Sequence, residues 1–148
     1  MRMNAARERQ RGTAALEFGL AAPVLLMILM GVVELGFAMY QAMQVTNSVE
    51  AGTLYAAKNG FNASGIASAV VNATGTAGIV ATPAPTEFCG CPETSGIVAT
   101  TCGATCADGS TPGQYARISA ALTRVTILPY PALGLPDTLT AHSIVRLN

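Results

Sequence analysis

One feature near the N-terminus constrains the fold of this chain most, because the stretch from Arg11 to Asn59 has the pattern of a single long helix with two different surfaces. From Gly12 to Tyr40 nearly every residue is apolar. Beyond this stretch, and overlapping its end, apolar or small residues recur at spacings of three and four, which predicts one helical face. These residues are Leu35, Met39, Ala42, Val45, Val49, Thr53 and Ala56. Asn59-Gly60 is the expected helix stop, since glycine readily adopts the left-handed conformation found there. The pattern predicts a stem that lies first in a membrane and then packs against other helices.

The basic residues indicate how this stem is oriented. The chain has 148 residues and a formal net charge of zero, but half of its eight basic residues precede the apolar stretch: Arg2, Arg7, Arg9 and Arg11. By the positive-inside rule the N-terminus stays in the cytoplasm, and everything after Tyr40 lies across the membrane. The other basic residues are scattered, so the sequence gives no support for nucleic-acid binding.

The apolar core of the stem is short for a membrane span. Phe18 to Val33 has 16 residues, about 24 Å of helix at 1.5 Å per residue, whereas the hydrocarbon core of a bilayer is roughly 30 Å thick. Spanning therefore brings Glu17 and Glu34 close to the two membrane interfaces. We interpret Glu34 as a charge in a headgroup layer, where it costs much less than in mid-membrane.

Glu17 has a second interpretation, which depends on the residues before it. A glycine, Gly12, follows the basic leader and precedes the glutamate by five residues. Cleavage after Gly12 would make Thr13 the new N-terminus, with its ammonium four residues from Glu17 on the same helical face. An opposite charge at close range offsets desolvation of the carboxylate. In a filament, the ammonium of a neighbouring subunit would do the same and set the register between adjacent helices.

These residues resemble the processing site of type IV prepilins, which a membrane prepilin peptidase cuts after the glycine. The motif Gly12-x4-Glu17-Phe18, followed by Leu20-Ala21-x-Pro23 and Gly31-Val32-Val33-Glu34-Leu35-Gly36, resembles the TadE-like family of pilin-related proteins. The stretch Glu50-Ala51-Gly52-x-x-Tyr55-Ala56-Ala57 resembles the end of that family's stem. Val49 and Thr53 replace arginines that are common there, so this face does not carry those two charges.

The resemblance implies a non-catalytic minor pilin or pseudopilin of the bacterial tight-adherence (Flp) pilus, a type IV-like system, with roles in pilus assembly and adhesion. It implies as partners other pilin or pseudopilin subunits, the prepilin peptidase, the inner-membrane assembly platform and membrane lipid. The expected location is the inner membrane, with the head outside the cytoplasm. The expected parts are a cytoplasmic leader (1–12), a helical stem (13–60) and a head (61–148).

Two other interpretations of the N-terminal residues stay open at the level of sequence. In one, the chain is an envelope protein with a single span and a binding head, and it keeps its leader. In the other, the apolar stretch is a secretory signal with a small-x-small site at Gly36-Phe37-Ala38, and cleavage after Ala38 releases the head. Glu34 before that site and the unbroken helical pattern through it both argue against the signal peptide.

The cysteines form one cluster in the second half of the chain. Cys89-Gly90-Cys91 and Cys102-x3-Cys106 are separated by ten residues. In an oxidising compartment we expect two disulfides that both cross the loop, because a bridge within Cys89-Gly90-Cys91 would be strained. The pairing stays open. A zinc site is the alternative, although structural zinc prefers two-residue spacings between its cysteines and a reducing compartment.

The rest of the chain predicts a small α+β head. Residues 63–74 predict a short helix with Ile66, Ala69, Val70 and Ala73 directed inward. Ile79 to Thr82 predicts a short strand, which the two prolines that follow confine to an edge or a bend. Tyr115 to Leu128 and Thr138 to Leu147 alternate between apolar and polar residues, with a proline-rich loop, Pro129 to Pro136, between them. We expect these two runs to form an antiparallel pair packed on the amphipathic half of the stem, which is a pilin-like fold.

We expect no enzyme activity, no metal and no cofactor. His142 is the only histidine, and it falls on the polar side of its predicted strand. No second base, nucleophile or metal ligand accompanies it in the sequence, so we interpret it as an exposed bystander.

Overall fold

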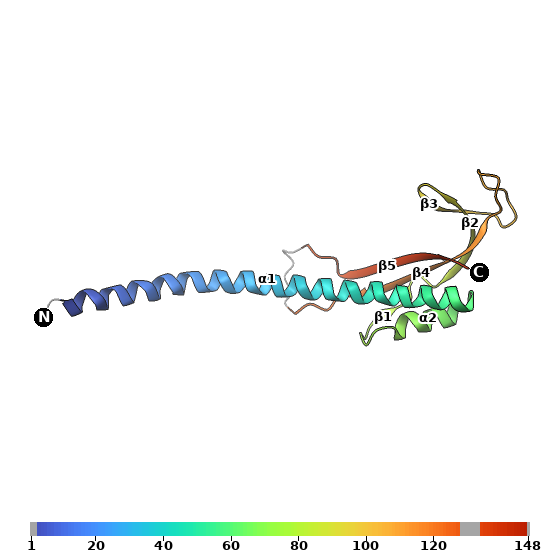
Figure 1. Cartoon of the computed structure of the whole chain (residues 1–148). Helices are drawn as coiled ribbons and strands as arrows, with labels where there is room; N and C mark the ends of the chain where they lie inside the picture. Colours follow the sequence, from blue (N-terminus) through green and yellow to red (C-terminus); the bar gives the residue numbers. More distant parts are fainter. Residues whose placement is uncertain (1–2, 128–133, 148) are drawn as a thin grey trace.

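The protein consists of one very long helix and a small head packed against the C-terminal half of that helix (Figure 1). The computed structural model describes residues 3–127 and 134–147, with side chains from Ala14 onward. The elements follow in the order α1, α2, β1, β2, β3, β4 and β5. This is the α+β arrangement that the sequence predicts, with a long N-terminal helix and an antiparallel sheet.

Helix α1 (Met3–Asn59) has 57 residues, which corresponds to about 86 Å at 1.5 Å per residue. It continues through Pro23 and ends where Gly60 adopts a φ of 73°. The Gly60 N–H donates a hydrogen bond to the Ala56 carbonyl at 2.9 Å, which closes the last turn. The predicted stop at Asn59-Gly60 is confirmed.

The face of α1 that packs on the head differs from the predicted one at its N-terminal end. Leu35 and Met39 are exposed, so their placement on the packed face was wrong. The buried positions are Glu34, Ala38, Gln41, Val45, Ser48, Val49, Gly52 and Ala56. The prediction followed apolar residues alone, whereas Glu34 and Gln41 face the head because polar groups of the head bind them.

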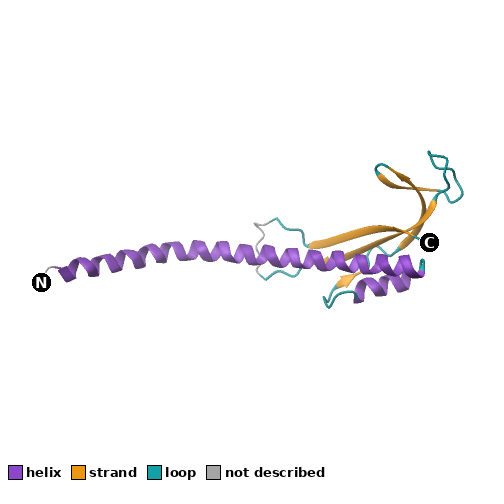
Figure 2. Ribbon diagram, viewed as in Figure 1, coloured by secondary structure: helices purple, strands orange, loops and turns teal. Residues whose placement is uncertain are grey.

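Helix α2 (Ala63–Asn72) lies alongside the end of α1 (Figure 2). The side chain of Asn62 caps it by accepting a hydrogen bond from the Gly65 N–H at 2.9 Å, which satisfies one of the free donors of the first turn. Ile66 and Val70 are buried as predicted, whereas Ala73 lies beyond the helix and is exposed.

The sheet has five strands and is antiparallel throughout. Strand β4 (Gly113–Thr123) is central: β5 (Thr138–Arg146) pairs along one side, and β1 (Ile79–Val80) and β2 (Thr86–Glu93) pair along the other. Strand β3 (Gly96–Thr100) extends β2 as a hairpin. The predicted antiparallel pair is therefore β4–β5, and the short strand at Ile79 lies at an edge as expected.

The core lies between the two helices and the face of β4 that carries Ile118, Ala120 and Leu122. Val45, Val49 and Ala56 reach it from α1, and Ile66 and Val70 reach it from α2. Gly52 permits close contact, since a Cβ there would lie 2.6 Å from Val70 Cγ2. The core thus fixes the head on the second half of the stem and leaves the first half outside.

Two further predictions differ from the structure. Residues 86–100 form the β2–β3 hairpin. The sequence analysis did not assign them to strands, because Gly90 and Pro92 interrupt the usual strand pattern. Strand β4 ends at Thr123 and does not continue to Leu128. The next residues, Arg124 to Ile127, turn to the stem. Most of the predicted loop from Pro129 to Pro136 lies outside the described residues.

Candidate functional site

The N-terminal half of the stem exposes an apolar surface on all sides. From Ala14 to Met30 the side chains are exposed, apart from the half-buried Ala22, and none is buried. Helix α1 is long and apolar enough to cross a membrane. A helix that is apolar all round is typical of a membrane span or of a buried helix, so this part of the chain is compatible with a membrane anchor.

The residues predicted for processing lie at the start of this surface. Gly12 and Thr13 are within α1, and Glu17 follows one turn later with an exposed side chain. Residues 13 and 17 are four apart in a continuous helix, so both lie on one face. This spacing is compatible with the proposed ammonium–carboxylate contact, while cleavage itself stays a prediction.

The junction between stem and head is built on Glu34. Its carboxylate accepts a hydrogen bond from Arg124 Nη1 at 3.1 Å and another from the Ile127 N–H at 3.1 Å. The ion pair is shielded from water, with exposed side-chain fractions of 8% for Arg124 and 3% for Glu34. The sequence indicated that Glu34 is a charge in a headgroup layer. In the structure its carboxylate also has a second role, because it binds the head.

Arg124 also organises the head side of this junction. Its Nε donates to the Pro136 carbonyl at 3.0 Å, and its backbone N–H donates to the Asp137 carbonyl at 2.7 Å. One guanidinium thus connects the end of β4, the start of β5 and the stem. Hydrogen bonds to charged groups are among the stronger ones in proteins, so this contact fixes the base of the head on α1.

A second contact lies two helical turns further along the stem. Gln41 Nε2 donates to the Val125 carbonyl at 2.9 Å, and Gln41 Oε1 accepts from the Val125 N–H at 2.9 Å. The Gln41 side-chain amide thus binds both the backbone N–H and the backbone carbonyl of Val125, as the backbone of a neighbouring strand would. Residues 124–127 are therefore held along α1 by two polar side chains, Glu34 and Gln41.

The far end of the head is held by two disulfides, Cys89–Cys102 and Cys91–Cys106. Cys89 and Cys91 are two apart in β2, so their side chains lie on the same face of the strand. Both bridges cross from this strand to the segment before β4, and this pairing is what the sequence left open. The zinc alternative requires thiolates at these positions, and the structure has disulfides there instead.

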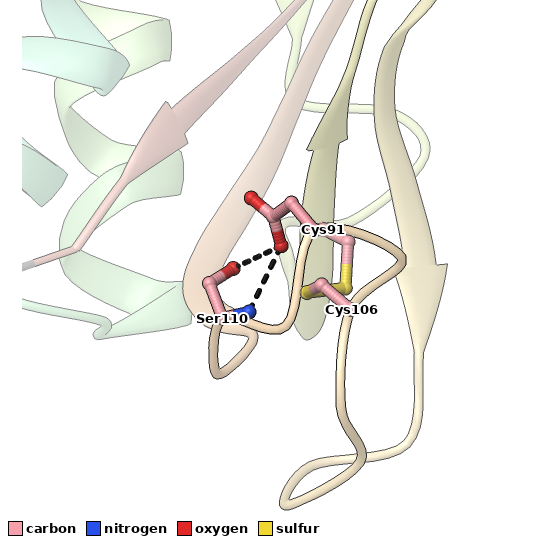
Figure 3. Close-up of a disulfide and its surroundings, with 4 residues drawn as sticks. Cys91, Cys106 and Ser110 are labelled. Atoms are coloured by element: carbon pink, nitrogen blue, oxygen red, sulfur yellow. Dashed lines mark hydrogen bonds between the residues drawn. A yellow bond between two sulfur atoms is a disulfide. The ribbon is translucent and has the colours of Figure 1, made fainter.

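A tight turn follows Cys106, and Figure 3 shows the Cys91–Cys106 bridge beside Ser110. Asp108 Oδ1 accepts hydrogen bonds from the Ser110 hydroxyl at 2.7 Å and from the Ser110 N–H at 3.0 Å. These two bonds lower the pKa of Asp108 below its ordinary value of 3.8, the hydroxyl contributing most. The turn orders an exposed loop that has little apolar packing of its own.

The family comparison concerns the stem. Residues 12–54 match the family model described as TadE-like protein. Over these residues the stem is similar to that family. The match confirms the resemblance predicted from the motifs around Gly12, Glu17 and Glu50, and it ends inside α1, before the head begins. Comparison with curated proteins gives no match, and comparison with solved structures gives none.

The contacts between the stem and the head were not predicted from the sequence, although a signal for them exists. Glu34, Gln41 and Ser48 recur every seven residues, and Ala38, Val45 and Gly52 form a second row with the same spacing. A seven-residue repeat marks a seam along a helix that packs on a partner. Because three of these positions are polar, a search for apolar residues passes over them.

The solvent face of the sheet carries a shallow hollow of about 430 Å³. Arg117, Ser119 and His142 line it, with Thr82 and Pro83 at its side. The Arg117 guanidinium lies 5.3 Å from the centre of the Phe88 ring, and His142 is exposed, as predicted. Among the residues that the structure describes, no three His, Cys, Asp or Glu side chains lie together as a metal site requires.

Proposed function

We propose that this protein is a non-catalytic minor pilin or pseudopilin of a bacterial tight-adherence pilus, active in pilus assembly and surface adhesion. The observation that carries the proposal is the TadE-like match over residues 12–54, which lies within α1 and ends before the head. Its support is that the matched segment contains both the exposed apolar half of α1 and the predicted processing residues.

In this proposal the stem has two successive environments. It first anchors the subunit in the inner membrane, with the basic leader in the cytoplasm and the head outside. After a prepilin peptidase removes residues 1–12, the stem leaves the lipid through the assembly platform and packs among the stems of other pilin subunits. Apolar side chains lose little in moving from lipid to a helix bundle, so the transfer needs no refolding of α1.

Glu17 has a specific role in this process. A carboxylate at the start of an apolar helix is costly in a bundle unless a cation lies beside it. The free ammonium of Thr13, in the same or a neighbouring subunit, is that cation. Charge pairing at one fixed position along the stem gives neighbouring subunits a defined axial register.

The head of the subunit is suited to this role because it stays folded while the stem changes its surroundings. Its core includes the second half of α1, and two disulfides hold its far end. The exposed β2–β3 hairpin and the solvent face of the sheet are then the surfaces that meet other subunits or an external target. This is the basis for proposing adhesion.

The test is the intact mass and N-terminal sequence of the protein from membranes of cells that contain its prepilin peptidase, measured without reductant. We expect a start at Thr13 and a mass four hydrogens below that of the reduced chain. Gly12→Val is expected to keep the leader. A start at Met1 in the unaltered protein would contradict the pilin proposal and indicate an anchored envelope protein. A soluble form that starts at Met39 would indicate that the segment before it is a signal peptide.

A second test separates processing from assembly. Glu17→Gln is expected to leave cleavage intact and to remove the protein from sheared pili. Glu50→Gln is the matched control, since Glu50 is an exposed glutamate in the same helix at the level of the head. Equal recovery of both variants in pili would contradict the role of Glu17.

A further inference from the structure

Glu34 ends the uninterrupted apolar run of the stem, but exposed apolar side chains continue beyond it. Phe18 to Val33 supplies only about 24 Å of helix, which leaves roughly 6 Å of a bilayer core unspanned. Beyond Glu34, the side chains of Leu35, Met39 and Tyr40 are exposed. The exposed surface of the helix is therefore long enough for a membrane, provided that Glu34 can lie at or below the membrane boundary.

The structure supplies the means for Glu34 to lie there. Its carboxylate is buried against the head, paired with Arg124 and bonded to the Ile127 N–H. A paired and hydrogen-bonded carboxylate that faces protein is the form in which charged residues are tolerated at membrane depth. The lipid-facing side of the helix at this level is left with Leu35 and its apolar neighbours.

The head contributes apolar side chains at the same level. Val125 and Ile127 are exposed to 62% and 56%, although both are large aliphatic residues. The Val125 N–H binds Gln41 and the Ile127 N–H binds Glu34. Gln41 and Glu34 are seven residues apart, which is about 10 Å along the helix. Residues 125–127 therefore run along the stem towards its N-terminal half, at the end of the head that lies nearest that half in Figure 1.

We propose that Val125 and Ile127 of the head and Leu35, Met39 and Tyr40 of the stem together form a membrane-contact surface, called the base below. Its partner is the lipid of the leaflet on the head side, at the boundary between headgroups and acyl chains. Tyrosine is enriched at that boundary, and Tyr40 lies at the corresponding position of the stem. The inference rests on the membrane anchoring in the proposed function and adds that the head itself sits in the interface.

Lipid is favoured over a second copy of the chain because of continuity. On α1 the exposed side chains of Leu35, Met39 and Tyr40 follow the exposed apolar residues that end at Val33, and the charge between them, Glu34, is buried. Apolar residues that continue the exposed surface of the anchor are expected to contact the same lipid as the anchor. Seating the head in this way would fix its height above the membrane before assembly.

Tryptophan fluorescence gives a direct test, because the chain contains no tryptophan. The full chain is reconstituted in phosphatidylcholine vesicles, and single-tryptophan variants are compared with and without bromine on the acyl chains. Ile127→Trp reports on the base, Leu26→Trp on the middle of the apolar stem, and Val98→Trp on the exposed hairpin strand β3. Val125→Trp is a second reporter on the base, and the intact mass without reductant shows that the disulfides have formed.

We expect Ile127→Trp to lose emission in brominated vesicles, most strongly when the bromines lie near the headgroup end of the chain. Leu26→Trp should respond most to bromines deep in the bilayer, and Val98→Trp should not respond. If both base variants behave like Val98→Trp, the inference is wrong. A blue-shifted but unquenched Ile127→Trp would assign the base to a second copy. An unquenched Leu26→Trp would overturn the membrane anchor as well.

Discussion

The two halves of helix α1 are continuous in backbone but opposite in surroundings. From Ala14 to Val33 no side chain is buried, whereas from Glu34 onward one side of the helix is covered by the head. Both halves contain good helix formers, so helix propensity does not distinguish them. The difference teaches that the arrangement of small, polar and apolar residues along one helical face, and not the apolar content of the helix as a whole, decides which half packs on the head.

The polar members of the seam show how this selection works. Glu34 binds Arg124, Gln41 binds Val125, and the Ser48 hydroxyl donates to the Gln44 carbonyl at 2.9 Å. Among the described residues, no buried side-chain polar atom is left without a hydrogen-bond partner. Buried polar groups that are fully satisfied specify one arrangement of the packed elements. The head is thereby held in one register along the stem.

The largest effect is expected where the two halves meet. Arg124→Leu leaves the Glu34 carboxylate buried without its cation, and removing one partner of a buried ion pair costs about 3–5 kcal/mol. We expect the free energy of unfolding of the head to fall by that order. The measurement is denaturant unfolding of the full chain in detergent micelles, followed by hydrogen exchange of the β4 amides.

The double variant Glu34→Leu/Arg124→Leu is the control for this prediction. It removes both charges together, and replacing a buried pair by apolar residues is often close to neutral. We expect it to be more stable than Arg124→Leu alone. If the single and double variants lose equal stability, the ion pair does not hold the head on the stem.

A valine-to-alanine change in each half tests the comparison with one chemistry. Val45 is 1% exposed and Val24 is 57% exposed. Val45→Ala removes two buried methyl groups and leaves a cavity in the core, so we expect the head to lose ~2 kcal/mol. Val24→Ala should leave unfolding of the head unchanged, when both are measured by the same hydrogen exchange. Equal losses would mean that the first half of the stem also packs on the head.

A glycine-to-alanine change gives a smaller and more geometric test. A Cβ at Gly52 would meet Val70 Cγ2 at 2.6 Å, whereas a Cβ at Gly31 would meet nothing within 4 Å. Overpacking costs about 1–3 kcal/mol, partly offset by the ~1 kcal/mol that alanine gains over glycine in a helix. We therefore expect Gly52→Ala to destabilise the head and Gly31→Ala to leave its unfolding unchanged. A stabilised Gly52→Ala would show that α1 and α2 can separate without cost.

Much of this arrangement was predictable from local patterns. The stem, its stop at Gly60, helix α2 and the β4–β5 pair follow from periodicity and glycine chemistry. The TadE-like match was predicted from the motif around Gly12 and Glu17. These features share one property, which is that their signal lies within a few turns of helix or a single strand.

The junction was not predictable in the same way. Glu34 and Arg124 are 90 residues apart, and neither residue alone indicates the other. The β2–β3 hairpin was missed because Gly90 and Pro92 are poor strand residues. It forms because Gly90 gives room for Ile97, whose Cγ2 would lie 2.5 Å from an added Cβ. Pairings across long separations depend on such tertiary contacts.

The smallest effect is expected in a region away from both halves of the stem, and it limits how far the comparison extends. Asp108 accepts two hydrogen bonds from Ser110 that lower its pKa in the folded protein below the ordinary 3.8. Its contribution to stability is therefore present above pH 3.8 and is lost as the pH falls through the lower, folded pKa. We expect the Ser110 amide resonance to titrate with a midpoint below 3.8, and Ser110→Ala to return the Asp108 midpoint towards that value. Asp108→Asn should abolish the titration while exchange of the β4 amides stays unchanged, because the turn lies outside the core. A change in β4 exchange would instead couple this loop to the stem, and the packed half of the molecule would then include the disulfide region.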